Sequence, residues 1–170
     1  MNKCVFLDRD GVLNQDTEGY LFRSEDLIIP DGTYEALRRM KDAGYLLIVI
    51  TNQAGIAKGL YKAEDVIDCY RFLQQQCGNI LDDLYFSPHH PDYTSNSLLR
   101  KPESLMIEKA IAKYRIDPGQ SWMVGDGERD VQAGHKAGVR AIRITHKSSI
   151  DTAAEAISKN LLEASNLIVS

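Results

Sequence analysis

Four short, almost wholly apolar runs recur along the chain, each bounded by polar residues or glycine. They cover residues 4–7, 45–50, 121–124 and 139–144. Runs this short are typical of strands that are buried on both faces. The segments between them carry apolar residues at helical spacing, which predicts helices near 33–43, 63–77, 102–114 and 130–136. Strands that alternate with helices indicate an α/β fold with a doubly wound, mainly parallel sheet.

The remaining segments extend this alternation. In chain order they are expected to be a loop at 14–29, a strand at 83–86, a loop at 87–100, a helix near 151–163 and a short strand at 167–169. The chain has 170 residues, which is an ordinary size for one domain. Residues 1–170 are therefore interpreted as a single domain.

The composition narrows the classes of partner. A net charge of −4, with 44% hydrophobic and 26% charged residues, is the balance of a soluble globular protein. This charge gives no pull toward nucleic acid or an anionic membrane, so neither partner is expected and an anionic substrate needs a local cluster of cations. No apolar run approaches the ~20 residues that span a bilayer. Three cysteines without a Cys-x-x-Cys spacing argue against a disulfide framework and favour the reducing cytoplasm.

Polar residues follow several of the predicted strands. Asp8 and Asp10 come after the first apolar run, Thr51, Asn52 and Gln53 after the second, and Asp126 after a later one, while Arg100 and Lys101 precede a predicted helix. In open parallel sheets, ligands bind beyond the carboxyl ends of the strands. We therefore expect these side chains to meet at one edge of the sheet.

The chemistry of this set points to phosphoryl transfer. Carboxylates such as Asp8, Asp10 and Asp126 are oxygen ligands that suit Mg²⁺. Phosphoryl transfer depends mainly on positioning and charge neutralisation, which Lys101, the Thr51 hydroxyl and a metal ion can supply. Each residue taken alone is more often a turn former, a helix cap or solvated surface. The joint pattern, with each group at a strand end, favours a phosphoryl site.

The same residues carry a resemblance to a known family. Asp8-Arg9-Asp10-Gly11, Thr51-Asn52-Gln53, Lys101 and Gly125-Asp126 with Asp130 resemble the four motifs of the haloacid dehalogenase (HAD) superfamily. The resemblance implies that Asp8 is the nucleophile, that Asp10 acts as acid and then base, and that Thr51 and Lys101 hold the phosphoryl group. It also implies Mg²⁺ held by Asp8, the Asp10 backbone carbonyl and Asp126, with Asp130 steering metal-bound water or Lys101.

A closer resemblance is to the D-glycero-D-manno-heptose 1,7-bisphosphate 7-phosphatases, which act in nucleotide-heptose synthesis. It rests on the segments 6–14, 51–59, 87–91 and 100–102, and histidinol-phosphate phosphatases share much of this pattern. These enzymes lack a large cap domain, and no insertion here is long enough to be one. The match implies a small phosphosugar substrate, a monomer, and substrate contacts from Asn52, Gln53, Arg100 and the segment 16–20 with Gly19 and Tyr20.

The chain departs from these relatives at a zinc site and at one lysine. Relatives bind structural zinc through Cys-x-His and Cys-x-Cys, and the matching positions here are Ser87, His89, Ser97 and Leu99. Structural zinc sites take four sulfur or nitrogen ligands, so no zinc is expected. Gly127 stands where relatives often carry a lysine that reaches the substrate.

Two other classes of function compete with a phosphatase. A phospho-accepting receiver domain also uses aspartates, threonine, lysine and Mg²⁺, but its phosphorylated aspartate follows the third strand, where this chain has Ser87-Pro88. A catalytically dead binding module would have lost motif residues, and here every motif position is filled. A phosphosugar phosphatase is the preferred hypothesis, with histidinol phosphate or another small phosphate ester as the alternative substrate.

Overall fold

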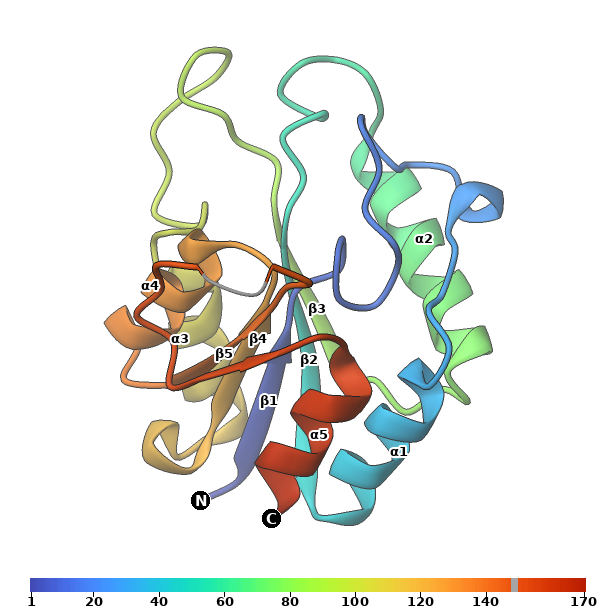
Figure 1. Cartoon of the computed structure of the whole chain (residues 1–170). Coiled ribbons are helices and arrows are strands. Elements are labelled where there is room, and N and C mark those ends of the chain that lie inside the picture. Colours follow the sequence, from blue (N-terminus) through green and yellow to red (C-terminus); the bar gives the residue numbers. More distant parts are fainter. Residues whose placement is uncertain (148–149) are drawn as a thin grey trace.

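A six-stranded parallel sheet runs through the described part of the chain, residues 1–147 and 150–170 of a computed structural model. Its strands are β1 (Lys3–Leu7), β2 (Tyr45–Asn52), β3 (Asp83–Ser87), β4 (Trp122–Gly125), β5 (Arg140–Ile144) and β6 (Ala156–Ser158). Their order in the sheet is β3-β2-β1-β4-β5-β6, with β1 between β2 and β4. The chain therefore winds outward from β1 in both directions, as the doubly wound fold predicts (Figure 1).

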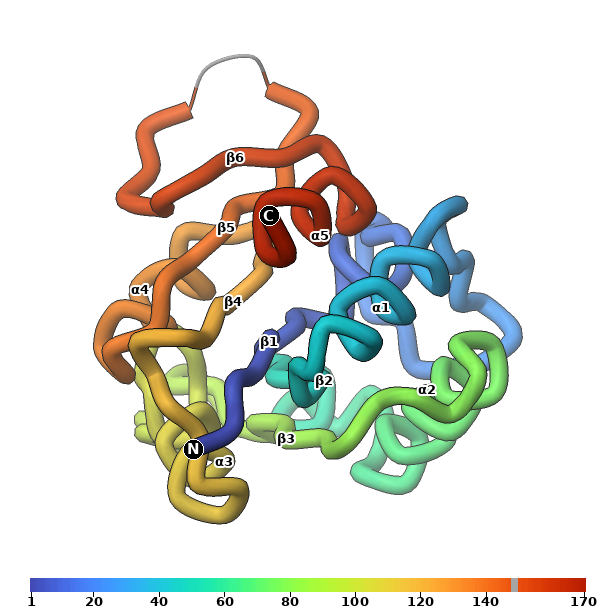
Figure 2. The backbone as a smooth tube through the Cα atoms, turned by 90° about the horizontal axis from the view of Figure 1, so that it is seen from below, coloured from blue at the N-terminus to red at the C-terminus, as the bar shows by residue number. Residues whose placement is uncertain are grey.

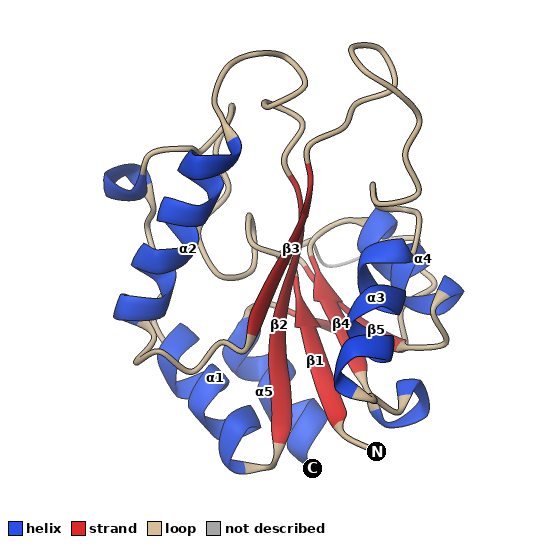
Figure 3. Ribbon diagram, turned by 180° about the vertical axis from the view of Figure 1, so that it is seen from behind, coloured by secondary structure: helices blue, strands red, loops and turns tan. Residues whose placement is uncertain are grey.

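Helices cover both faces of this sheet. On one face lie α1 (Thr33–Asp42), α2 (Ala63–Gln76) and α5 (Leu161–Val169), and on the other lie α3 (Leu105–Tyr114) and α4 (Glu128–Lys136). The view from below separates the two layers on either side of the strands (Figure 2), and the view from behind shows the same arrangement (Figure 3). Two short 3₁₀ helices, Ser24–Asp26 and Pro118–Gln120, lie in connecting segments.

Alternate side chains along the strands pack into two separate hydrophobic cores, one on each face of the sheet. In β1, Val5 and Leu7 pack toward α1 and α5, whereas Cys4 and Phe6 pack toward α3 and α4. All four are completely buried. Burial on both faces explains why the strands read as continuous apolar runs rather than as alternating patterns.

The C-terminal prediction was wrong in type as well as in position. Where a helix near 151–163 and a strand at 167–169 were expected, residues 156–158 form the edge strand β6 and residues 161–169 form α5. The Asn160 side chain accepts a hydrogen bond from the Glu163 N–H (2.9 Å) and so caps the helix start. Leu161, Ala164 and Ile168 then bury one helical face against the core. Packing of this stripe outweighs the β propensity of the terminal Leu-Ile-Val.

The start of α3 also lies later than predicted, at Leu105 rather than Pro102. Residues 101–103 form a turn because the Asn52 amide binds both backbone groups of Lys101. Asn52 Nδ2 donates to the Lys101 carbonyl and the Lys101 N–H donates to Asn52 Oδ1, each at 3.0 Å. The backbone at Lys101 is thereby tied to the end of β2 and cannot join the helix.

The carboxyl ends of the strands face a group of loops, and both chain termini lie at the opposite end (Figure 1). The segments that follow β1, β2 and β3 rise above this edge, and they include the loops predicted at 14–29 and 87–100. None of the described helices has the length and apolarity that crossing a membrane requires.

Candidate active site

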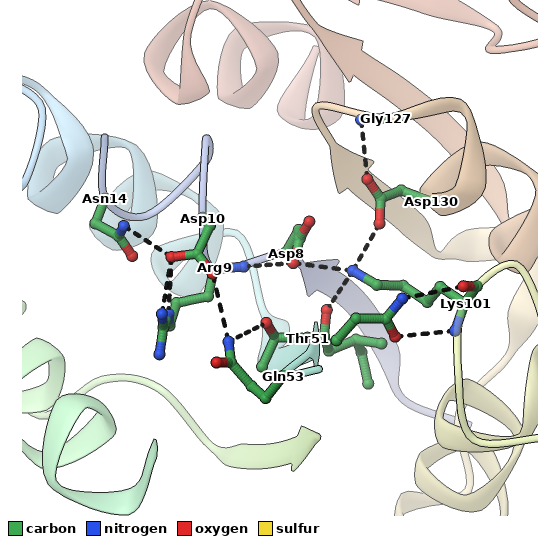
Figure 4. A network of polar contacts seen from close by, with 11 residues as sticks. Asp8, Arg9, Asp10, Asn14, Thr51, Gln53, Lys101, Gly127 and Asp130 are labelled. Carbon is green, nitrogen blue, oxygen red and sulfur yellow. Dashed lines mark hydrogen bonds and ion pairs between the residues drawn. The ribbon is translucent and has the colours of Figure 1, made fainter. Parts of the chain in front are cut away.

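The side chain of Lys101 lies in a buried cluster of opposite charges at the carboxyl ends of β1 and β2 (Figure 4). Its Nζ is 2.9 Å from Asp8 Oδ1 and 2.6 Å from Asp130 Oδ1, and it donates to the Ile50 carbonyl at 2.8 Å. Burial disfavours the charged amine, but Asp130 and Asp8 outweigh it and raise the pKa of Lys101. The cluster therefore holds a permanent cation against the Asp8 carboxylate.

Asp8 is the most strongly perturbed carboxylate of this cluster. Its side chain is almost fully buried, and burial together with the nearby Asp130 charge raises its pKa to about 7 against the pull of Lys101. Burial and Asp130 also raise the pKa of Asp126. Carboxylates that repel one another in a buried site need an additional positive charge to stay ionised together.

Asp8, Asp126 and Asp130 form a candidate cation site. One oxygen from each carboxylate lies within 4.8 Å of the others. Gly11 keeps this corner open, because a Cβ there would lie 2.2 Å from Asp126 Oδ2 and the residue has a φ of +80°. The donors are hard oxygens of net negative charge, which fits Mg²⁺.

The Asp10 carboxylate lies apart from this cation site. Its Oδ1 accepts hydrogen bonds from Arg9 Nε (3.1 Å), Arg9 Nη2 (2.9 Å) and Asn14 Nδ2 (3.0 Å). Its Oδ2 accepts from Gln53 Nε2 at 3.3 Å. Figure 4 shows the carboxylates of Asp8 and Asp10 as separate groups with different partners. An Asp10 contribution to metal binding through its backbone carbonyl stays a prediction.

The residues at the end of β2 contact Asp10 and Lys101. Thr51 is buried, and its Oγ1 accepts a hydrogen bond from Gln53 Nε2 at 2.9 Å. Asn52, predicted to face a sugar, lines the cavity above the site while its amide binds the Lys101 backbone. All three residues of the Thr-Asn-Gln motif thus lie at this strand end, as predicted.

A cavity of about 400 Å³ opens above Asp10. The predicted residues Gly19, Tyr20, Asn52, Gln53 and Arg100 line it, together with Asp10 itself. The lining residues that were not assigned to the site from the sequence include Arg9, Tyr61 and Arg129.

Two arginines, Arg100 and Arg129, line this cavity. Partial burial lowers the pKa of Arg100, and the positive charge of Arg129 lowers it further. Among the described residues, neither guanidinium forms an ion pair. Arg100 Nη1 instead donates to the His89 carbonyl at 3.2 Å. Two like charges brought together without carboxylate partners mark a place that favours an anion.

The residues that were not assigned to the site differ in whether the sequence could have indicated their place in it. Arg9 stands inside the Asp-Arg-Asp motif, and its burial, with 2% of the residue exposed, could not be read from a charged residue type. Arg129 lies in the first turn of α4, directly after the Gly125-Asp126 strand end, so its position was available as a signal. Tyr61 carries no signal of its own, because an aromatic residue before a helix usually indicates core packing.

The loop at 87–100 is held by its own hydrogen bonds. The Asp92 N–H donates to His90 Nδ1 (3.2 Å), and the Leu99 N–H donates to Ser97 Oγ (3.2 Å). The His90 ring packs edge-on against Tyr93, with 5.3 Å between ring centroids. Of the positions that match the zinc ligands of relatives, Ser97 and Leu99 are thus hydrogen-bonded to each other.

Comparison with known proteins places these features in a family. Residues 98–164 match a family model described as HAD-hydrolase-like. A protein of Burkholderia mallei named D-glycero-alpha-D-manno-heptose-1,7-bisphosphate 7-phosphatase is 40% identical over 170 residues, 94% of this chain and 89% of its own length. One of Haemophilus ducreyi named as the 7-phosphatase of the beta form is 40% identical over 146 residues, 81% of this chain and 80% of its own.

A solved structure of a protein with the same kind of name has the same fold as this chain. The D,D-heptose 1,7-bisphosphate phosphatase from B. bronchiseptica, complexed with magnesium and phosphate, superposes with a TM-score of 0.88 and 25% identity over 98% of both chains. Identity of 40% across nearly the whole chain shows that this protein belongs to the HAD-like phosphatases, in the family of proteins named heptose-1,7-bisphosphate 7-phosphatases.

Proposed function

We propose that this enzyme removes the C7 phosphate of D-glycero-D-manno-heptose 1,7-bisphosphate through an aspartyl-phosphate on Asp8. The supporting observation is the distribution of charge around one cavity. Asp8 and Lys101 form a buried ion pair, and the residues that follow Asp8, Arg9 and Asp10, line the cavity. Arg100 and Arg129 also line it and form no ion pair among the described residues. A substrate with a phosphate at each end would place one phosphate at Asp8, where Lys101 and Mg²⁺ would supply positive charge, and the other at the two arginines.

The first step forms a bond between an Asp8 oxygen and phosphorus while the bond from phosphorus to the C7 oxygen breaks. Lys101 and the Thr51 hydroxyl stabilise the charge on the transferring group. Protonated Asp10 gives its proton to the C7 oxygen, because a sugar alkoxide is a poor leaving group. Asp10 is left as a carboxylate, which Arg9 and Asn14 stabilise through the hydrogen bonds to Oδ1.

The second step returns both carboxylates to their starting states. Asp10 takes a proton from water, and the hydroxide oxygen attacks phosphorus as the bond to Asp8 breaks. Phosphate leaves with the Asp8 carboxylate restored. Asp8 and Asp126 would hold Mg²⁺ with the Asp10 backbone carbonyl, and Asp130 would orient Lys101 or metal-bound water; the ion supplies positive charge to the transferring phosphoryl oxygens.

The substrate assignment is tested by phosphate release across a panel. The panel contains the alpha and beta heptose 1,7-bisphosphates, histidinol phosphate and common sugar monophosphates. We expect a heptose bisphosphate to have the highest kcat/KM. A flat profile with slow turnover throughout, or a clear preference for histidinol phosphate, would contradict the heptose assignment.

A contact between Arg129 and the second phosphate can be tested with the same panel of substrates. Arg129→Gln is expected to raise KM for the bisphosphate about tenfold, since one charge-assisted hydrogen bond contributes about 1.5 kcal/mol. The KM for sugar monophosphates should stay unchanged. Arg71→Gln, on the exposed surface of α2, is the matched control and should alter neither value. Equal changes for both kinds of substrate would contradict a distal phosphate contact.

Mg²⁺ should stabilise the folded enzyme measurably. An ion at about 100 times its Kd adds about 2.7 kcal/mol, which is roughly a 5 to 10 °C rise in Tm for a domain of this size. Asp126→Asn should abolish this rise while leaving the Tm in EDTA unchanged or higher, because it removes one of three repelling carboxylates. Asp68→Asn, a surface change on α2, should keep the full Mg²⁺ response.

Purified enzyme is expected to contain no stoichiometric zinc. The positions Ser87, Ser97 and Leu99 offer no thiolate or imidazole, and a structural site usually takes four such ligands. Elemental analysis of metal-free-buffer preparations checks this expectation, and one zinc per chain would contradict it.

The proposal extends to the organisation of the enzyme. We propose that residues 1–170 act as one domain and as a monomer in the cytoplasm, with a small phosphosugar as the partner. One domain is supported by the single sheet, in which the ends of β1, β2 and β4 bring the predicted site residues to one edge. Sedimentation analysis at working concentration tests the monomer.

A further inference from the structure

The hydroxyl of Tyr61 lies buried next to the candidate active site. Only 7% of the residue is exposed, and the ring lines the cavity above Asp10. Its hydroxyl donates a hydrogen bond to Gln53 Oε1 at 2.6 Å. Burial raises the pKa of Tyr61 to about 12, so it stays a donor at neutral pH.

This donor fixes which way the Gln53 amide faces. An amide has one oxygen acceptor and one nitrogen with two donor hydrogens, and its two ends can exchange places by rotation. With Oε1 bound to Tyr61, Nε2 faces both Thr51 Oγ1 (2.9 Å) and Asp10 Oδ2 (3.3 Å). Gln53 is itself 2% exposed, so no bulk water competes for these contacts.

The two oxygens of Asp10 are thereby made unequal. Oδ1 accepts three hydrogen bonds, two of them from the Arg9 guanidinium. These donors make Oδ1 the oxygen that stays without a proton. Oδ2 accepts one long hydrogen bond from Gln53, which leaves it as the oxygen that can carry a proton. A flipped Gln53 would present Oε1 to Oδ2, accept that proton's hydrogen bond and turn it away from the leaving oxygen.

We propose that Tyr61 is a positioning residue, which acts through Gln53 to keep the proton of Asp10 Oδ2 directed at the substrate. The inference rests on the proposed acid–base role of Asp10. The hydroxyl forms no bond with the reacting atoms and transfers no proton in either step.

The surroundings of Tyr61 hold its ring in one place. A Cβ at Gly55 would lie 2.0 Å from Tyr61 Cε1, so the absence of a side chain at position 55 makes room for the ring. On its other side the ring stacks on Phe22, with centroids 5.2 Å apart and planes 8° from parallel. A ring fixed by close backbone approach and by stacking can aim a hydroxyl at one acceptor.

Substrates with different leaving groups can distinguish a positioning role of Tyr61 from a purely structural role. Kcat/KM reports phosphoryl transfer to Asp8, and only an alkoxide leaving group needs a proton in that step. Tyr61→Phe should therefore lower kcat/KM for heptose bisphosphate about tenfold, a part of the usual contribution of a general acid. For p-nitrophenyl phosphate, whose leaving phenolate needs no proton, kcat/KM should fall clearly less, because only the Gln53 contact with Thr51 bears on that substrate.

Two further variants sharpen the test. Tyr45→Phe removes another buried tyrosine hydroxyl, also at 7% exposure, which donates to the Ile168 carbonyl away from the site; it should leave both substrates unaffected. In a Gln53→Leu background, adding Tyr61→Phe should cause no further loss, because the two residues act in series.

The outcomes also separate this inference from the proposed function. Asp10→Asn must show the same selective loss for the alkyl phosphate. If it does not, the acid role of Asp10 fails and the role of Tyr61 fails with it. If Asp10→Asn shows the selectivity but Tyr61→Phe lowers both substrates equally, lowers neither, or adds its effect to Gln53→Leu, then only the role of Tyr61 is overturned.

Discussion

Asp8→Asn is expected to lower kcat at least about a thousandfold while the protein stays folded, because the amide cannot form the aspartyl-phosphate. The substitution keeps the size and shape of a side chain that is 3% exposed. It also removes a carboxylate whose pKa is raised by burial and by the nearby charges of Asp130 and Asp126. The Tm in EDTA should therefore fall little or not at all. Phosphate release and thermal unfolding, measured on the same preparation, check the two expectations together.

Asp68→Asn is the control for this experiment, since it makes the same chemical change on the exposed face of α2. It should leave kcat within about twofold of the parent enzyme, as surface changes away from the site usually do. Trapping after acid quench adds a direct readout: the parent enzyme should carry phosphate on the chain and Asp8→Asn should carry none. Phosphate release that survives Asp8→Asn would contradict the nucleophile assignment.

The strands around β1 could be predicted from the sequence because burial on both faces leaves an unambiguous apolar run. The segment 45–50 illustrates this, as it lies wholly within β2. The C-terminal segment gave no such signal. Residues 156–158 are too few to show the alternation of a strand. The apolar residues of 161–169 fit a helix or a strand equally well, and only packing against α1 and the sheet decides for the helix.

Some residues of the candidate site could likewise be predicted from the sequence, and others could not. Asp8 and Asp126 could be placed together because each follows a strand end, and the fold brings those ends to one edge. Lys101, just before a predicted helix, could be placed with them by the chemistry of the motif set. The neighbours of Asp10 could not, because they depend on side-chain direction. Arg9 precedes Asp10 in sequence, yet its guanidinium folds back onto the Asp10 carboxylate. Such contacts follow from the packed surroundings rather than from spacing along the chain.

The loss of the lysine at position 127 shows how the structure changes the meaning of a sequence difference. On the sequence alone, Gly127 removes a cation from the substrate region. In the structure, Arg129 from the same helix start lines the cavity with Arg100. Position 127 meanwhile supplies a backbone N–H that donates to Asp130 Oδ2 at 3.0 Å. Arg129 thus supplies a cation to the cavity two residues further along the chain, and we expect specificity to depend on it.

Lys101→Met is expected to lower stability as well as activity, since it leaves Asp8 and Asp130 buried without their cation. Removing one partner of a buried ion pair costs about 3 to 5 kcal/mol, or roughly 6 to 20 °C in Tm for a domain of this size. Methionine keeps most of the aliphatic stem, so packing loss contributes little. Turnover should become undetectable because the transferring phosphoryl group loses its fixed charge. Thermal unfolding in EDTA and in Mg²⁺ measures the cost, and Mg²⁺ should recover part of it.

The double variant Lys101→Met with Asp130→Asn distinguishes charge imbalance from loss of packing. Asp130 is wholly buried, and its Oδ1 is 2.6 Å from Lys101 Nζ, so neutralising it removes the carboxylate most dependent on the lysine. Asparagine can still accept the Gly127 N–H hydrogen bond. We expect the double variant to regain at least half of the lost Tm while remaining inactive, because stability depends on balanced charge whereas catalysis depends on the ammonium itself. If Asp130→Asn restores no stability, the destabilisation of Lys101→Met comes from packing, and the account of Lys101 as the charge that balances this cluster is wrong.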